Sequence, residues 1–161
     1  MTDAITGLAA RVGRGARQRA VTIATAESCT GGGVAEAITR IAGSSAWFER
    51  AFVTYTNTAK VEMLGVLPGT LADFGAVSEA VARQMAAGAL AHSGAGVAVA
   101  VTGIAGPTGG TPAKPVGLVW IAWTHRGGDP QCRRFHFRGD RAAVRRQSVE
   151  VALQGLIDLL G

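Results

Sequence analysis

The amino-acid sequence predicts a three-layer α/β fold, with a mixed, mostly parallel β-sheet covered by helices on both faces. Apolar runs with strand character alternate along the chain with segments whose apolar residues recur at helical spacing. Two late strands are joined by so short a connection that they must pair antiparallel. The 161 residues are 48% hydrophobic and 17% charged, which favours a compact fold over disorder. We expect one domain over residues 1–161.

The first part of the chain is expected to alternate helix and strand. Helices are predicted over residues 4–19, 32–41 and 57–64, and strands over residues 21–26 and 51–55. Thr56 can cap the third helix, because its side-chain oxygen can accept from the N–H groups of the first turn. Gly65 then marks the end of that helix.

The second part contains the central strand and the hairpin. Ser78 precedes an alanine-rich helix that reaches residue 92, and residues 97–101 form an apolar, β-branched run suited to a central strand. A long loop rich in glycine and proline follows over residues 102–115. Strands over residues 116–124 and 132–137 then form the hairpin. Asp140 can cap the last helix, and four of its side chains share one face: Val149, Leu153, Leu156 and Leu160.

The most informative segment is residues 25–32, where an apolar strand meets a glycine-rich turn that carries the Ser28 hydroxyl and the Cys29 thiol. A nucleophile at such a junction stands clear of the sheet. Backbone N–H groups at the start of the next helix can hold an oxyanion, and our candidates are Thr30, Gly31 and Gly32. The alternative is that the polar residues only cap this helix. Glu27 is interpreted as a structural acceptor for backbone donors.

Polar and glycine-rich positions follow three of the predicted strands. Ser28 and Thr30 follow the first, Tyr55 and Lys60 the second, and the long loop the third. Parallel strands end at the same edge of a sheet, which is where α/β proteins bind ligands. The loop lacks the Gly-Lys-Ser/Thr ending of a P-loop. The alternative to a ligand-binding role is that the loop is only a long surface turn. Its candidate substrate-binding residues are Thr102, Gly103, Gly106, Gly109 and Gly110.

The net charge of +5 comes largely from arginines near the C-terminus. The cluster consists of Arg126, Arg133, Arg134, Arg138, Arg141, Arg145 and Arg146. Nucleic acid is an unlikely partner because few aromatic residues suited to base stacking accompany the cluster. Arg141 and Arg145 lie four residues apart, so both lie on one helix face and could form a fork around a phosphate. A solvated face is the alternative.

Several classes are disfavoured by composition. Two cysteines, Cys29 and Cys132, cannot form a disulfide framework or a four-ligand metal site, so we expect no metal. No apolar run approaches the roughly 20 residues that span a bilayer, so no membrane partner is expected. The N-terminal segment lacks the apolar core of a secretory signal. We therefore expect a cytoplasmic protein, with a homodimer as the default oligomer.

Five segments carry a resemblance to a known family: TAESCTGG, AGSSAWFERAFVTYTNTAK, LGV, GAVSE and TGIAGPTGGTPAKPVG. They resemble the C-terminal domain family of the competence/damage-inducible protein CinA, over nearly the whole chain. The resemblance implies a nicotinamide mononucleotide amidohydrolase of pyridine nucleotide salvage, which releases ammonia and needs no cofactor. Position 33 is Gly where the family leads us to expect a larger apolar residue.

The same resemblance implies a Ser-Lys mechanism, with Ser28 as nucleophile, Lys60 as general base and Tyr55 in the same site. The three histidines lie outside the glycine-rich turns, so a Ser-His-Asp triad lacks a natural base. A lysine can serve as base if burial favours its neutral form, whereas an exposed helical Lys60 is the alternative. A second possibility is that the enzyme carries out the same reaction on a different amide. A non-enzymatic competence or recombination partner that binds through the arginine cluster also stays open.

Overall fold

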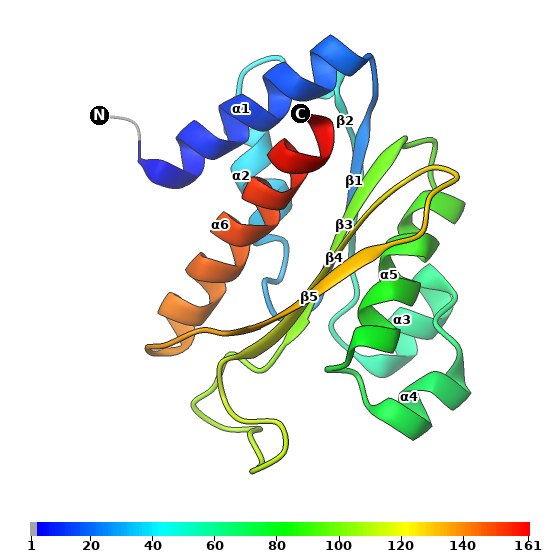
Figure 1. Cartoon of the computed structure of the whole chain (residues 1–161), viewed down its shortest axis with the longest axis vertical. Helices are drawn as coiled ribbons and strands as arrows, with labels where there is room; N and C mark the ends of the chain where they lie inside the picture. Colours follow the sequence, from blue (N-terminus) through cyan, green and yellow to red (C-terminus); the bar gives the residue numbers. More distant parts are fainter. Residues whose placement is uncertain (1–2) are drawn as a thin grey trace.

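The structure is a computed structural model that describes residues 3–161, so the first two residues of the predicted domain lie outside it. It shows a single α/β domain in which a five-stranded sheet lies between two helical layers (Figure 1). The strands are β1 (Ile23–Glu27), β2 (Phe48–Val53), β3 (Val97–Gly103), β4 (Leu118–His125) and β5 (Gln131–His136). The helices are α1 (Ala4–Arg19), α2 (Gly33–Thr39), α3 (Asn57–Leu64), α4 (Pro68–Phe74), α5 (Glu79–Ala91) and α6 (Arg141–Leu160), with a 3-10 turn at Ser44–Ala46.

The sheet has the order β2-β1-β3-β4-β5 and is mixed, as predicted. β1 pairs in parallel with both β2 and β3, whereas β4 pairs antiparallel with both β3 and β5. Of the strands in residues 3–161, β4 alone therefore runs against the others. β1 is buried along its whole length, and so is β3 except for Gly103, which explains their continuous apolar sequences.

Each face of the sheet has its own core. Helices α1, α2 and α6 cover one face, and α3, α4 and α5 cover the other (Figure 1). β3 illustrates the division, because Val99 packs on the first face while Ala98 packs on the second. The small side chains of the second face let α5 approach closely. α5 also packs closely against the end of α3. A Cβ at Gly88 of α5 would lie 2.0 Å from the carbonyl oxygen of Leu64 in α3, so only glycine fits where the two helices meet.

The predicted helix boundaries depend largely on caps, and these are confirmed. Thr56 Oγ1 accepts from the N–H of Ala59 at 3.1 Å, and Asp140 caps α6 in the same way. The four predicted apolar side chains of α6 are all buried. The sequence did not predict α4, because its seven residues bury no side chain and so show no apolar face. No helix of residues 3–161 is long and apolar enough to cross a membrane.

Candidate active site

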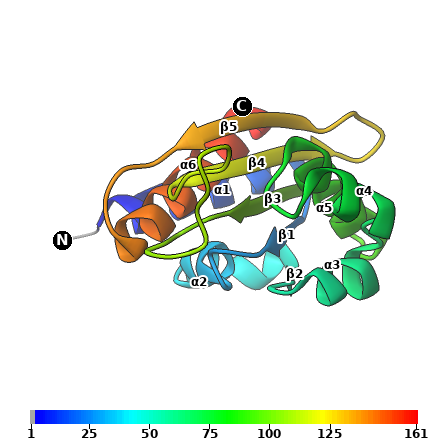
Figure 2. The same ribbon diagram turned by 90° about the horizontal axis from the view of Figure 1, so that it is seen from below.

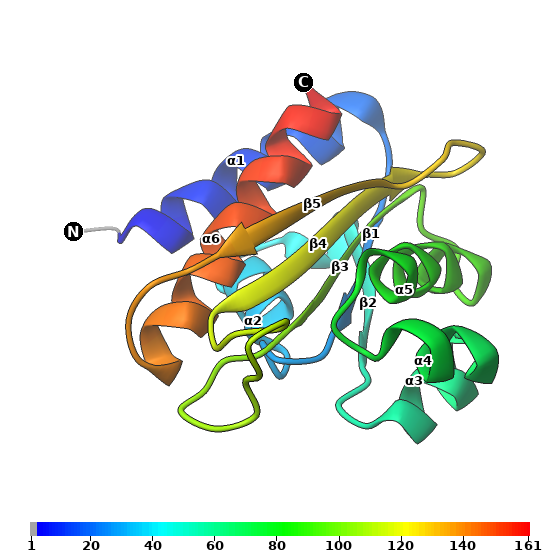
Figure 3. The same cartoon turned by 60° about the horizontal axis from the view of Figure 1, so that its bottom comes forward.

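The predicted site residues gather where the parallel strands end. Figure 2 views this edge of the sheet, which we call the rim, from below, and Figure 3 brings it forward. Four segments meet there: the turn after β1, the chain from β2 into α3, the loop after β3, and the start of α6. The expectation that these segments share one edge is therefore confirmed by the topology.

Ser28 and Lys60 are in direct contact at the rim. Lys60 Nζ lies 3.0 Å from Ser28 Oγ, and it also donates to the carbonyl oxygens of Thr54 at 2.9 Å and Tyr55 at 3.3 Å. The Lys60 side chain is only 1% exposed, so the alternative of an exposed helical lysine does not hold. Burial lowers the pKa of Lys60, although the nearby Cys29 raises it. The environment therefore favours the neutral amine that a general base requires.

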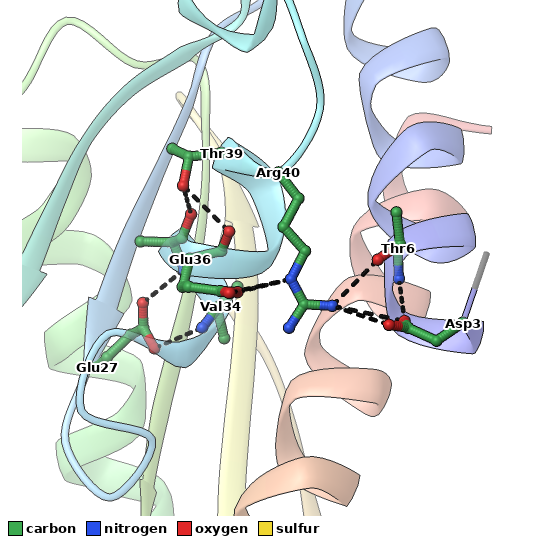
Figure 4. A network of polar contacts seen from close by, with 8 residues as sticks. Asp3, Thr6, Glu27, Val34, Glu36, Thr39 and Arg40 are labelled. Carbon is green, nitrogen blue, oxygen red and sulfur yellow. Dashed lines mark hydrogen bonds and ion pairs between the residues drawn. The ribbon is translucent and has the colours of Figure 1, made fainter. Parts of the chain in front are cut away.

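Glu27 fixes the helix that follows the turn. Its buried side chain accepts four hydrogen bonds, two at each oxygen. Figure 4 shows Glu27 directed at the start of α2. The N–H groups of Val34 and Ala35 donate to it at 2.9 Å each, and the hydroxyls of Thr25 and Thr30 donate at 3.1 and 2.7 Å. Glu27 thus caps α2 from a distance, which confirms its interpretation as an acceptor for backbone donors. These two N–H groups are consequently not available to an oxyanion.

The turn between β1 and α2 depends on glycine. Gly31 and Gly32 have φ of 59° and 100°, in the left-handed region that favours glycine. The N–H of Ser28 donates to the carbonyl oxygen of Val101 on β3, and the N–H of Gly31 donates back to the carbonyl oxygen of Ser28, each at 3.0 Å. The Gly31 N–H, one of the predicted oxyanion donors, is therefore engaged within the turn.

Two arginines of α6 reach the rim, and both remain exposed to solvent. Arg141 donates to the Tyr55 hydroxyl at 3.0 Å and to the Gly106 carbonyl oxygen at 2.9 Å. Arg145 donates to the carbonyl oxygens of Cys29 at 3.2 Å and Thr30 at 3.3 Å. The structure thus joins the loop after β3, the Tyr55 segment and the Ser28 turn through the first two turns of α6.

The loop after β3 has a packing reason for several of its glycines. A Cβ at Gly103 would lie 2.6 Å from Val119, and a Cβ at Gly106 or Gly110 would collide with Val116. Thr102 Oγ1 donates to the carbonyl oxygen of Ala76 at 2.9 Å, and Lys114 Nζ donates to that of Phe74. The loop is therefore tied to the segment around α4. A pocket between this loop and the start of α6 includes Arg141 in its lining.

Two further observations concern thiol and metal chemistry at the site. Burial raises the pKa of Cys29 to about 11, so its side chain is a thiol at neutral pH. In the part of the chain that the structure describes, no group of three or more His, Cys, Asp or Glu residues could hold a metal ion. Sequence reasoning missed the carbonyl oxygens of Thr54 and Tyr55 that hold Lys60. The signal available was their position immediately before the capped start of α3.

Comparison with known proteins identifies the family of the chain. Residues 5–160 match the model of the CinA C-terminal domain. The chain belongs to the CinA C-terminal domain family. It is 55% identical over 157 residues to the nicotinamide-nucleotide amidohydrolase PncC of Pseudomonas putida, covering 98% of each chain. It is also 55% identical to PncC of Escherichia coli K12, covering 97% of this chain and 95% of that one.

The fold is shared with solved structures of the family. The competence/damage inducible protein CihA of Agrobacterium tumefaciens matches with a TM-score of 0.97 and 49% identity, over 100% of this chain and 98% of that chain. A CinA superfamily protein of Escherichia coli matches with a TM-score of 0.92 and 37% identity, over 99% and 93% of the two chains. The resemblance inferred from the sequence motifs is therefore confirmed at the level of family and fold.

Proposed function

We propose that the protein hydrolyses the carboxamide of nicotinamide mononucleotide to nicotinic acid mononucleotide and ammonia, through an acyl-enzyme on Ser28. The observation that carries the proposal is the 3.0 Å contact between Ser28 Oγ and the buried Nζ of Lys60. The relatives named as nicotinamide-nucleotide amidohydrolases support the choice of substrate. We place the reaction in the cytoplasm, as a step of pyridine nucleotide salvage, and retain the homodimer as a prediction.

A charged Lys60 would donate all three of its hydrogen bonds, and a neutral amine, which has two N–H donors and one lone pair, can also make all three contacts. The carbonyl oxygens of Thr54 and Tyr55 can take the two donors, which leaves the lone pair for the Ser28 hydroxyl. In the proposed reaction, Lys60 accepts the Ser28 proton as Oγ attacks the carboxamide carbon. It returns this proton to the departing ammonia, and water then hydrolyses the ester to release the acid.

The phosphate of the substrate requires cationic groups at the rim. Arg141 suits this role because it borders the pocket beside the loop and contacts Tyr55, so a phosphate bound there would lie across the rim from Ser28. The prediction that Arg145 also binds the phosphate stays a prediction. Its contacts with two carbonyl oxygens suggest a different role, which is argued below. The loop residues Thr102, Gly103, Gly106, Gly109 and Gly110 remain proposed substrate contacts.

The competing proposal, a partner protein that binds through its arginine cluster, finds less support in the structure. Arg126 donates to the carbonyl oxygens of Leu90, Ser93 and Ala95, and thereby ties β4 to the end of α5. Arg133 lies over the Phe135 ring, with its guanidinium carbon 5.2 Å from the ring centroid. Together with Arg141 and Arg145, four of the seven arginines of the cluster thus have separate local contacts, whereas nucleic acid would require one continuous basic surface.

Ammonia release is the direct test. Wild-type protein is incubated with nicotinamide mononucleotide, and with nicotinamide, its riboside and the dinucleotide as comparison substrates. We expect release from the mononucleotide, loss of nearly all turnover in Ser28→Ala and Lys60→Met, and normal turnover in the control Cys132→Ser. Circular dichroism establishes that each variant is folded. Full turnover in Lys60→Met would exclude Lys60 as the base. Ammonia release from one of the comparison substrates, but not from nicotinamide mononucleotide, would show that the proposed substrate is wrong.

A further inference from the structure

Two backbone N–H groups beside Ser28 belong to buried residues and have no acceptor within residues 3–161. Cys29 is 6% exposed and Thr30 is 1% exposed. No backbone or side-chain acceptor of residues 3–161 receives either N–H, whereas the next N–H, that of Gly31, donates to Ser28. Buried backbone donors without a partner are rare in folded proteins, because each costs the free energy of a lost hydrogen bond. Two consecutive ones next to a nucleophile indicate a site prepared for an anionic atom.

The direction of the Thr30 N–H follows from the planarity of the peptide bond. In a trans peptide, the N–H of one residue points opposite to the C=O of the residue before it. Arg145 donates to the carbonyl oxygen of Cys29, so the N–H of Thr30 points away from Arg145. Arg145 lies on α6, on one face of the sheet, and Lys60 lies on α3, on the other (Figure 1). The Thr30 N–H is therefore directed away from the side of the rim that α6 occupies.

We propose that the N–H groups of Cys29 and Thr30 form the oxyanion hole, and that Arg145 is the positioning residue that orients this turn. The inference rests on the proposed amidase function and deepens it. Arg145 holds the carbonyl oxygens of Cys29 and Thr30, and so fixes the two peptide planes that contain the N–H groups of Thr30 and Gly31. Its charge also polarises these peptides, which makes their N–H groups stronger donors.

The step served by this arrangement is the attack on the carboxamide. A bond forms between Ser28 Oγ and the carboxamide carbon, and the π electrons of the C=O bond move to its oxygen. The Ser28 proton passes to Lys60. The oxygen, now negatively charged, is stabilised by the N–H groups of Cys29 and Thr30, while Arg145 does not touch the substrate. Loss of Arg145 should therefore affect the transition state more than the bound substrate or product.

The test compares Arg145→Met with Arg146→Met, a matched change at the neighbouring exposed arginine of α6. We expect Arg145→Met to lower kcat for nicotinamide mononucleotide about tenfold to a hundredfold, less than the loss of a whole oxyanion donor. KM and the Kd of the product nicotinic acid mononucleotide should stay within twofold of wild type, because the product keeps the phosphate but has no oxyanion. Arg145→Lys should recover part of kcat, and Arg146→Met should match wild type.

Three results would overturn the inference. An unchanged kcat in Arg145→Met would show that the turn does not need this side chain. Weaker binding of the product with an unchanged kcat would make Arg145 a phosphate ligand instead.

A third test uses labelling of Ser28 by a small sulfonyl fluoride, in which Oγ displaces fluoride from sulfur and Lys60 takes the proton. Equal labelling rates in Arg145→Met and Arg146→Met would also refute it. If wild type labels but releases no ammonia from the nucleotide, the proposed substrate fails while this comparison still decides the role of Arg145.

Discussion

Replacing Glu27 by Gln should destabilise the protein far more than its single-atom change suggests. Each carboxyl oxygen of Glu27 receives one hydroxyl and one backbone N–H. An amide places an NH₂ group where one oxygen was, so either Val34 or Ala35 then directs its N–H at another donor. The hydroxyls of Thr25 and Thr30 can rotate to accept from the amide, but a backbone N–H cannot.

The magnitude follows from these contacts. An unsatisfied buried backbone donor costs about 1–3 kcal/mol, and the remaining bonds lose the extra strength they have with a charged acceptor. We expect the free energy of unfolding to fall by about 3 kcal/mol. The matched control is Glu36→Gln in α2, the helix that Glu27 caps, where the Glu36 side chain is 60% exposed and pairs with Arg40 (Figure 4). This i,i+4 pair should contribute less than about 0.5 kcal/mol.

Urea denaturation of the two variants and the wild type measures both free energies, with the slope m as a check that the transition stays two-state. Because Glu27 also holds the Thr30 hydroxyl, kcat should fall in Glu27→Gln but not in Glu36→Gln. The reasoning is refuted if Glu27→Gln is within about 0.5 kcal/mol of Glu36→Gln, the size expected for an exposed pair. Equal stability would mean that the turn relaxes without cost and that α2 needs no cap.

Three further predictions concern Lys60, Arg141 and Thr54. Burial lowers the pKa of Lys60 from 10.5, so kcat/KM should rise with pH and then reach a plateau, and the midpoint of the rise should lie below pH 10.5. A rate–pH profile without such a rise would contradict the role of Lys60 as base. The unfolded chain binds more protons at Lys60 between these two pKa values, so its contribution to the free energy of unfolding should also rise with pH there. Arg141→Met should lower the ratio of kcat/KM for the nucleotide to that for the riboside, and an unchanged ratio would place the phosphate elsewhere. Thr54 Oγ1 is buried and has no hydrogen-bond partner in residues 3–161, so Thr54→Val should raise the free energy of unfolding by about 1 kcal/mol. Urea denaturation measures this change, and a loss of stability would show that the hydroxyl does make a stabilising hydrogen bond.

The sequence predicted the elements whose signals are local. The side chains of Thr56, Ser78 and Asp140 cap their helices as expected, because a cap depends only on residues within one turn. The start of β2 was predicted three residues too late, at residue 51 instead of Phe48. Phe48 joins the strand by pairing with Ile23, a partner that local pattern does not reveal. Tertiary pairing therefore extended the strand beyond its apolar run.

The site was harder to derive because its contacts join distant segments. The residues alone left Lys60 open between a buried base and an exposed helical side chain, and the family resemblance favoured the base. The decisive fact is that the chain leaving β2 passes beside the turn after β1, which depends on the strand order. The contacts of Arg145 depend in the same way on α6 packing next to α2, on one face of the sheet.

The reversed strand explains how the arginines of α6 reach the rim at all. β3 ends at the rim, so a single further strand would carry the chain away from it. The chain instead crosses back along β4, turns through a short hairpin and returns along β5, whose end lies at the rim again (Figure 3). α6 therefore begins beside the loop after β3, and Arg141 and Arg145 in its first two turns meet Gly106, Tyr55 and the Ser28 turn. An odd number of strands after β3 would have placed these guanidinium groups at the opposite end of the sheet, about 20 Å away for strands of six residues.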